Sequence, residues 1–431
     1  MHRQKVEYPC RAFTPARTKE TAMKVKSRPD DFQVEELPNV RPGKTGRFRF
    51  YRLTKEGLGT PEALEIIRRR WNLPASAVSH GGLKDKHAQT IQYLTIANGP
   101  DTNLIDRSFQ LEPVGCLNAP YGPEGFRGNR FTIRLRDLPR EKADHIRSAL
   151  DATVLEGVPN YFDDQRFGSV GLSGEFIIHA WMKEDHEKAL KIAMAEPHPF
   201  DRPAIRREKD LLQAHWLDWP TLKKELDKGN TRSVITYLCD HPADFRGAFT
   251  RSRRDMRRIY VSAFQSMLFN DMLDAWIRHF AAPEQLWQVK SKTGPRAFWH
   301  SLTDDQTKLV STTRLPLPCC RNPFPEEPAM AAAAAHVMEK WGLAWQSLRI
   351  KKMEDVFFGK GTREASLRPN VGNCTIQPDD LNTGRRMARL AFELPRGSYA
   401  TLIIKRLQAA VGERLVADNL GEEAAGDEAE E

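Results

Sequence analysis

Residues 79–96 (SHGGLKDKHAQTIQYLTI) gather several side chains that could do chemistry into one short segment. Asp85 stands between two lysines, whose positive charges favour the ionised form of its carboxyl group. An ionised carboxylate can act as a nucleophile or as a general base. The spacing alone is more typical of a solvated turn, and His80 and His87 beside the aspartate would also suit a metal-dependent hydrolase.

The neighbouring residues indicate how Asp85 is held. Gly81 and Gly82 allow a tight turn just before it. From Thr90 onwards, β-branched and aromatic residues alternate in part, which predicts a strand with at least one buried face. Upstream, Thr60 followed by proline predicts the start of a helix. Asp85 is therefore expected on a loop that rigid elements support.

The order of residue types around Asp85 resembles the signature of the TruD family of pseudouridine synthases, Gly-x-Lys-Asp-x-His-Ala-x-Thr-x-Gln. The matching residues are Gly82, Lys84, Asp85, His87, Ala88, Thr90 and Gln92. In that family the aspartate of this motif is catalytic, so the resemblance implies the same role for Asp85. It also places His87 on the substrate-binding loop, where we expect it to hydrogen-bond within the loop.

Residues 24–36 (KVKSRPDDFQVEE) resemble the first conserved block of the same family. Proline and aspartate predict a turn between two short strands. By this match Lys26 is the active-site lysine, which forms an ion pair with the catalytic aspartate. Without the resemblance, a single lysine beside a turn would be interpreted as a solvated charge.

A third block, residues 125–136 (GFRGNRFTIRLR), places Asn129 and Phe131 on the pair that the family uses at its substrate site. A uracil turned out of its helix needs a ring to stack on, and an amide can bond to nearby polar groups. The alternative is a core phenylalanine that begins a strand, with the asparagine in a turn.

A fourth block, residues 157–168 (GVPNYFDDQRFG), resembles the family's Gly-Val-Pro-Asn-Tyr-Phe-Gly-x-Gln-Arg-Phe-Gly. Asn160, Gln165 and Arg166 are expected to shape the wall of an RNA cleft. Asp163 replaces the family's glycine. If the backbone there needs a positive φ, aspartate tolerates it better than most residues, so a local adjustment is expected.

The run at residues 47–53 (RFRFYRL) interleaves basic and aromatic residues at strand spacing. It could form a base-stacking surface. We favour an edge strand with Phe48 and Phe50 inward and arginines outward.

Residues 250–258 hold a cluster of arginines just before a segment that resembles a family helix, residues 258–270, with Phe264 and Leu268 on its apolar stripe. The arginines are either a solvated helix face or RNA-phosphate contacts: Arg251, Arg253, Arg254, Arg257 and Arg258. Residues 389–405 resemble the closing block and predict strand, turn and helix.

The composition is that of a globular chain, with 40% hydrophobic and 29% charged residues among 431. Its net charge of +9, despite an acidic segment at 421–431, favours a polyanionic partner. The six cysteines include no Cys-x-x-Cys pair, which gives no zinc signature and favours a reduced, cytoplasmic setting. We expect neither a signal peptide nor a membrane span.

The resemblance extends over nearly the whole chain and implies an α+β protein. A pseudouridine-synthase catalytic domain with a mixed, largely antiparallel sheet would comprise residues 23–168 and 371–415, and a helix-rich insertion domain residues 169–370. Residues 1–22 would be a flexible lead-in and 416–431 a disordered acidic tail. The implied function is conversion of uridine to pseudouridine in tRNA at position 13, without cofactor, metal or obligate protein partner. The alternatives are a catalytically inactive tRNA-binding protein of this fold and the hydrolase.

Overall fold

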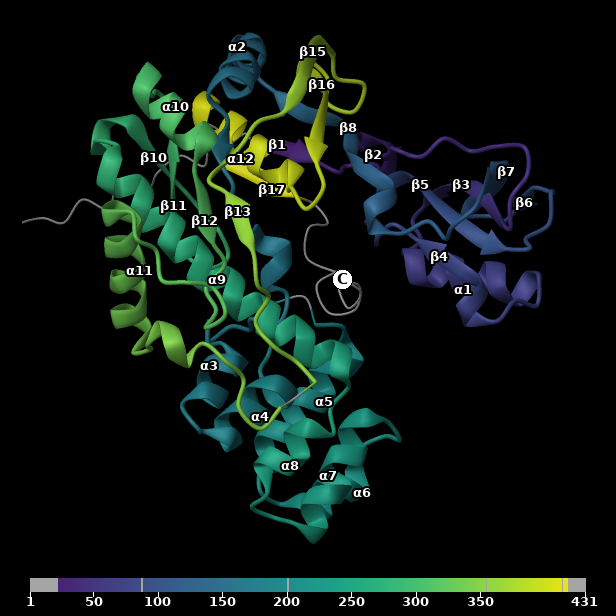
Figure 1. The fold of residues 1–431 in the computed structure, drawn as a ribbon, viewed down its shortest axis with the longest axis vertical. Coiled ribbons are helices and arrows are strands. Elements are labelled where there is room, and N and C mark those ends of the chain that lie inside the picture. Colours follow the sequence, from purple (N-terminus) through teal and green to yellow (C-terminus); the bar gives the residue numbers. More distant parts are fainter. Residues whose placement is uncertain (1–21, 87, 200, 354, 413, 418–431) are drawn as a thin grey trace, which may run out of the picture.

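The computed structural model describes residues 22–86, 88–199, 201–353, 355–412 and 414–417. Figure 1 shows a strand-rich part, to which both the first and the last described segments contribute, and a helix-rich part formed by the middle of the chain. The α+β class is confirmed, as is the mixed, largely antiparallel sheet.

The main sheet has 11 strands among the described residues. In spatial order its path is β15 (Asn370–Pro378), β16 (Arg386–Pro395), β8 (Phe126–Leu138), β2 (Phe32–Pro38), β5 (Gln89–Ala97), β3 (Phe48–Glu56), β7 (Phe109–Leu117) and β6 (Leu104–Ile105). Three short strands join it from the side: β1 (Ala22–Val25), β17 (Arg414–Ala417) and β4 (Val78–His80). Along this path only β2 and β5 run parallel, with Val34 opposite Thr90.

That parallel pair explains why two distant segments meet. Parallel neighbours begin at the same edge of a sheet. Lys26 precedes β2 and Asp85 precedes β5, so the topology brings both to one edge.

Three helices belong to this strand-rich part: α1 (Thr60–Arg70), α2 (Arg140–Glu156) and α12 (Ala400–Val411). The α1 helix packs Ala63 and Ile67 on the face of β3 and β5 that carries Tyr51 and Leu94. The α2 helix contacts α12 and β15, so the closing helix is fixed against the far end of the sheet.

The middle of the chain supplies the other helices: α3 (Ile177–Met182), α4 (His186–Ala195), α5 (Pro203–Ala214), α6 (Trp219–Glu225), α7 (Asn230–Asp240), α8 (Phe245–Thr250), α9 (Arg254–Phe280), α10 (Asp304–Thr312) and α11 (Pro328–Trp341). Three small two-stranded antiparallel sheets accompany them: β10 (Leu286–Val289) with β11 (Arg296–Trp299), β12 (Arg314–Pro316) with β13 (Thr362–Glu364), and β9 (Val158–Pro159) with β14 (Ser366–Leu367).

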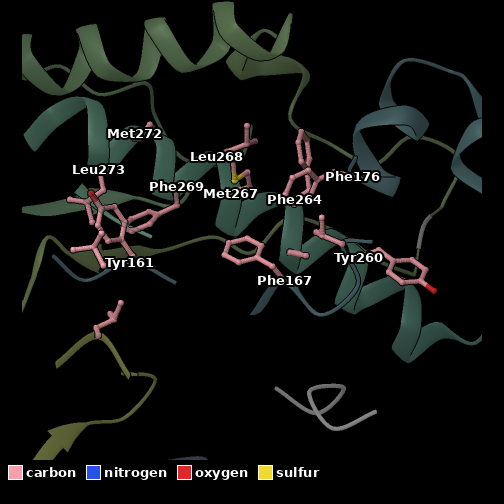
Figure 2. Packing of buried hydrophobic residues seen from close by; sticks show 14 of the residues in the cluster. Tyr161, Phe167, Phe176, Tyr260, Phe264, Met267, Leu268, Phe269, Met272 and Leu273 are labelled. Carbon is pink, nitrogen blue, oxygen red and sulfur yellow. The ribbon is translucent and has the colours of Figure 1, made fainter. Parts of the chain in front are cut away.

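The α9 helix is the axis of this part. Figure 2 shows Phe264, Leu268 and Met272 along it, with Phe167 and Phe176 packing from other segments. Phe264 and Leu268 are fully buried, which confirms the apolar stripe predicted for this helix. Among the described helices, none is long and apolar enough to cross a membrane.

Three sequence expectations need correction. β3 is not an edge strand, because it lies between β5 and β7; Phe50 is nevertheless buried against Tyr93 and Tyr121. Asp163 has a φ of −92°, so no positive φ is needed there. β17 continues to Ala417 beside β1, which itself starts at Ala22, so each strand passes its predicted domain limit. The rest of the predicted lead-in and tail lies outside the described residues.

Candidate active site

Lys26 and Asp85 form an ion pair at the edge where β2 and β5 begin. Lys26 Nζ lies 3.1 Å from Asp85 Oδ2, and the side chains are 7% and 22% exposed. The Lys26 ammonium also lies 4.4 Å from the centre of the Phe32 ring, the first residue of β2. The carboxylate therefore has a fixed cation on one side and remains accessible from another.

The turn that carries Lys26 is held in an unusual shape. Lys26 has a φ of 62°, a conformation that costs a non-glycine residue about 1–3 kcal/mol and persists only where its surroundings enforce it. The fully buried Asp31 accepts a hydrogen bond from the Arg28 backbone N–H at 3.0 Å. Arg136 in turn binds the Asp31 carboxylate at 2.8 and 2.9 Å. This network behind the turn directs Lys26 towards Asp85.

The two lysines next to Asp85 in the sequence are bonded elsewhere. Lys84 Nζ lies 2.8 Å from Glu36 Oε2, in a pair that is almost fully buried, and Lys86 Nζ lies 3.0 Å from Glu62 Oε1. The cations that act on Asp85 come from other segments, Lys26 from the turn after β1 and Lys55 from β3. We expected the sequence neighbours to favour ionisation, and the structure assigns this effect to distant lysines instead.

The electrostatics of the site keep Asp85 ionised. Burial raises the pKa of its carboxyl group, but the charge and hydrogen bond of Lys26, a hydrogen bond from Gln165 and the charge of Lys55 outweigh that effect. The net result is a pKa below the usual range of aspartate. An ionised carboxylate is the form that a nucleophile or a base requires.

The fourth block forms the adjacent wall. Gln165, which is exposed, donates from Nε2 to Asp85 Oδ1 at 3.4 Å. Arg166 donates to the hydroxyl groups of Tyr399 and Ser262 at 3.2 and 2.9 Å. Asn160 is buried, and both atoms of its amide bond to residues 363 and 364. Gln165 thus contacts Asp85, whereas Arg166 bonds to Tyr399 and Ser262, and Asn160 is fixed in the interior.

Asp163, the residue that departs from the family pattern, is bonded to two side chains of α12. It is 5% exposed and contacts Thr401 and the buried Lys405, both on α12. Lys405 also contacts Asp164 Oδ2 at 2.8 Å. The 3-10 turn Asp164–Phe167, which carries Gln165 and Arg166, is therefore tied to the closing helix.

The predicted base-binding pair, Asn129 and Phe131, lies on β8, the strand that pairs directly with β2. Asn129 is opposite Glu36 of β2, and its Oδ1 is buried without a hydrogen-bond partner among the described residues. The Phe131 ring is 6% exposed and packs against Phe32 and Phe392, with centroids 6.2 and 5.7 Å away. Asn129 therefore keeps an acceptor available for a ligand, whereas Phe131 belongs to the core in this structure.

The arginines of residues 251–258 divide into two kinds. Arg257 is buried and bonds to Thr250 O, Ser252 O and the Asp355 carboxylate, so a phosphate cannot reach it without breaking those bonds. The other four are exposed: Arg251, Arg253, Arg254 and Arg258. Arg253 and Arg254 pair with Asp255 and Asp355.

The histidines do not assemble a metal centre in the described part of the chain. His80 Nδ1 lies 3.2 Å from Gly82 O within the loop. No group of three or more His, Cys, Asp or Glu that could hold a metal occurs among the residues whose positions are described. His87, assigned to the substrate-binding loop, lies outside those residues.

Sequence reasoning missed two groups at this site. Lys55 is 1% exposed and donates to the carbonyl oxygens of Lys84 and Asp85 at 3.1 and 2.9 Å. Strand alternation was the available signal, because it places Lys55 on the same face as the fully buried Tyr51 and Leu53. Alternation likewise places Glu36 on the face of the buried Phe32 and Val34, although its partner, Lys84, lies on a segment that is distant in sequence.

Comparison with known proteins decides the family. The family model described as tRNA pseudouridine synthase D (TruD) matches residues 13–407, which is most of the chain. The chain belongs to the TruD family. A protein of Methanocaldococcus jannaschii named probable tRNA pseudouridine synthase D 2 is 27% identical over 390 residues, covering 89% of this chain and 91% of the relative. The tRNA pseudouridine synthase D of Leptospira interrogans is also 27% identical, over 404 residues, covering 89% and 95%.

The TruD fold is also found among solved structures. A crystal structure from Methanosarcina mazei, described as "putative tRNA pseudouridine synthase D", superimposes with a TM-score of 0.69. It covers 92% of this chain and 95% of its own, at 24% sequence identity. This likeness concerns the fold, and it agrees with the mixed sheet of the present TruD chain.

Proposed function

We propose that this protein converts uridine to pseudouridine in tRNA at position 13. The observation that carries the proposal is the ion pair between Lys26 and Asp85, formed by two motifs of the family at the edge where β2 and β5 begin. The pair supplies an ionised carboxylate beside a fixed cation. A protein that only binds RNA would not need this arrangement, so the pair favours an enzyme.

The reaction is an isomerisation. The bond between N1 of uracil and C1′ of ribose breaks, the base turns, and C5 forms a new bond to C1′ while its proton leaves. No group enters from outside, so neither a redox cofactor nor a nucleotide is required. Asp85 either attacks C1′ or removes the proton from C2′, and both steps use its ionised form. When C5 bonds to C1′, the carboxylate leaves C1′ in the first route, or the proton returns to C2′ in the second. A base then takes the proton from C5, and N1 gains a proton.

The base needs partners once it has left its helix. Asn129 Oδ1 is a buried acceptor without a partner among the described residues, and such an atom costs about 1–3 kcal/mol. An N–H of the turned-out uracil would satisfy it. Stacking on Phe131 would require the ring to separate from Phe32 or Phe392, which now cover it.

The wider arrangement that we propose keeps the two-part division, with RNA between the catalytic part (23–168 and 371–415, extended by β1 and β17 to residues 22 and 417) and the insertion (169–370). The exposed arginines at 251, 253, 254 and 258 would contact phosphates. Transfer RNA would be the partner and the cytoplasm the location, and no protein partner is required.

The decisive test is direct detection of product. Purified protein is incubated with an unmodified tRNA that has uridine at position 13, and pseudouridine is mapped at single-nucleotide resolution. We expect product at position 13 and none when that uridine is replaced by cytidine. Product at other positions alone would refute the site, and no product with any tRNA would refute the activity.

A further inference from the structure

Lys55 is a buried lysine that serves the backbone of the Asp85 loop. It lies near the end of β3 and is 1% exposed. Its ammonium group donates to three carbonyl oxygens, those of Leu58 at 2.6 Å, Lys84 at 3.1 Å and Asp85 at 2.9 Å. Two of these carbonyls belong to the peptide units on either side of the Asp85 Cα.

This arrangement is costly for stability. Lysine is almost never fully buried, and removing an ammonium ion from water costs several kcal/mol before its new bonds offset the loss. An apolar side chain of similar length would fill the same space beside Tyr51 and Leu53 without that cost. A role in positioning accounts for a lysine here, whereas packing alone does not.

Residues 82–85 have no regular secondary structure, so no helical or sheet hydrogen-bond pattern sets their direction. Side chains from neighbouring elements do so instead. The Lys84 N–H donates to Thr60 Oγ1 at 3.0 Å, and the carbonyls of Lys84 and Asp85 accept from Lys55. These bonds fix the Cα of Asp85, and hence the direction in which its carboxylate points.

We propose that Lys55 is a positioning residue for the reaction at Asp85: its buried ammonium group holds the peptide units around Asp85 and aims the carboxylate at the reacting nucleotide. This inference rests on the proposed function. Two effects follow from the geometry. The aim of the carboxylate is fixed, and the positive charge below the loop lowers the pKa of Asp85 together with Lys26.

The test compares two lysines of matched type. Lys55→Met removes the donors and the charge but keeps the length. Lys86→Met is the control, because Lys86 Nζ contacts Glu62 Oε1 at 3.0 Å. For each purified variant we would measure kcat, KM, tRNA binding, melting temperature and the pH dependence of kcat.

For Lys55→Met we expect kcat to fall by about 100-fold, the loss that a misplacement of about 1 Å can cause. KM and tRNA affinity should stay close to those of the wild type, and the acid limb of the kcat profile should move to higher pH. Lys86→Met should match the wild type in all of these. A merely structural role would lower the melting temperature without moving the acid limb. A kcat within about threefold of the control, or an unshifted acid limb, overturns the proposal.

If Lys55→Met does not fold, Lys55→Gln decides in its place. Glutamine is neutral and shorter but keeps an NH₂ donor, so we expect a smaller loss of kcat, about tenfold, with the same shift of the acid limb. A glutamine variant with the wild-type profile contradicts the inference. The wild-type enzyme separates the two proposals: active wild type with unaffected variants overturns only the role of Lys55, whereas wild type without product overturns both.

Discussion

Two basic regions of the molecule use positive charge in opposite ways. Around Asp85 three lysines are buried or nearly so, and each points at a defined oxygen: Lys26 at the carboxylate, Lys55 at carbonyls and Lys84 at Glu36. In residues 251–258 four of the five arginines are exposed. The difference teaches that burial, more than the number of charges, separates cations that set geometry from cations that can only attract.

The energetics support this distinction. A buried ion has lost its hydration and is therefore held where its partners are, so its removal disturbs a specific geometry. An exposed guanidinium keeps its water and is screened by salt, so it attracts a polyanion without fixing a position. The following predictions separate the two regions.

The largest expected effect is on chemistry alone. Asp85→Asn should form no detectable pseudouridine, because the amide can neither attack C1′ nor accept a proton, and a lost acid or base typically costs at least about 100-fold. Binding of tRNA should stay within about threefold of the wild type, since the phosphate contacts that we propose lie elsewhere. Product is measured by mapping after single-turnover incubation.

The matched control is Asp101→Asn, since Asp101 is 67% exposed and pairs with Arg49 in the same part of the molecule. This variant should behave like the wild type. Substantial product from Asp85→Asn would remove the catalytic assignment.

The second prediction concerns the buried pair behind the wall. Lys405→Met leaves the carboxylates of Asp163 and Asp164 without their cation, and breaking a buried pair in this way costs about 3–5 kcal/mol. Denaturant unfolding should show that loss. Lys188→Met, which breaks an exposed pair with Glu175, should cost less than about 1 kcal/mol. Equal losses would mean that burial does not distinguish these pairs.

The third prediction concerns pH. Lys26→Met should lower kcat at pH 7 by about tenfold and move the acid limb to higher pH. Lys26 holds the pKa of Asp85 below its usual value, so without Lys26 the carboxylate is protonated earlier as the pH falls. Because the folded-state pKa is depressed, the stability gained from the pair is present above the ordinary aspartate pKa and is lost as pH falls through the depressed value.

Lys24→Met is the control for this pH shift. Lys24 lies two residues away and pairs with Asp137 at 3.2 Å, away from Asp85. Its acid limb should coincide with that of the wild type. A common shift in both variants would trace the effect to the turn as a whole.

The smallest expected effect lies in the exposed region. The triple change of Arg253, Arg254 and Arg258 to alanine should weaken tRNA binding across sequences and reduce the slope of log affinity against log salt by about one per lost contact. Arg253 and Arg254 already pair with acids, so a phosphate that binds them must compete with those carboxylates, and each contact should add less to the affinity for tRNA. Filter binding over a range of salt concentrations measures the slope.

Arg257→Ala is the matching test for the buried arginine of residues 251–258. Its side chain is buried against Asp355 and two carbonyls, so its loss should lower stability and leave the salt slope unchanged. A changed slope in this variant alone would show that burial is a poor guide in this region.

The sequence predicted the local elements that motifs and periodicity define. The strands on either side of Pro29, the helix that begins at Thr60 and the strand after Asp85 all occur, as does the strand, turn and helix of the closing block. The proximity of Lys26 to Asp85 followed from the family resemblance, and the parallel pairing of β2 and β5 provides its physical cause.

What sequence could not supply were bonds between distant segments. Strand propensity is the same in an edge and a central strand, so nothing local showed that β3 has neighbours on both sides. The partners of Lys84, Lys86 and Asp163 depend on tertiary contacts, and sequence proximity favoured the wrong charges around Asp85. Arg257 is one of five similar arginines in its segment, and only the fold distinguishes it by burial.

The tie between Asp163 and α12 has a consequence for how the protein matures. Lys26 and Asp85 are 59 residues apart in sequence, whereas Asp163 and Lys405 are 242 apart. Contacts between distant residues form late, because closing a longer loop costs more chain entropy and the later segment must first be synthesised. The proposed catalytic pair can thus assemble early on the ribosome, while the turn that carries Gln165 is secured only when α12 emerges. A nascent chain would thus hold the Asp85 carboxylate before the turn beside it is secured, and we expect activity only after α12 has docked.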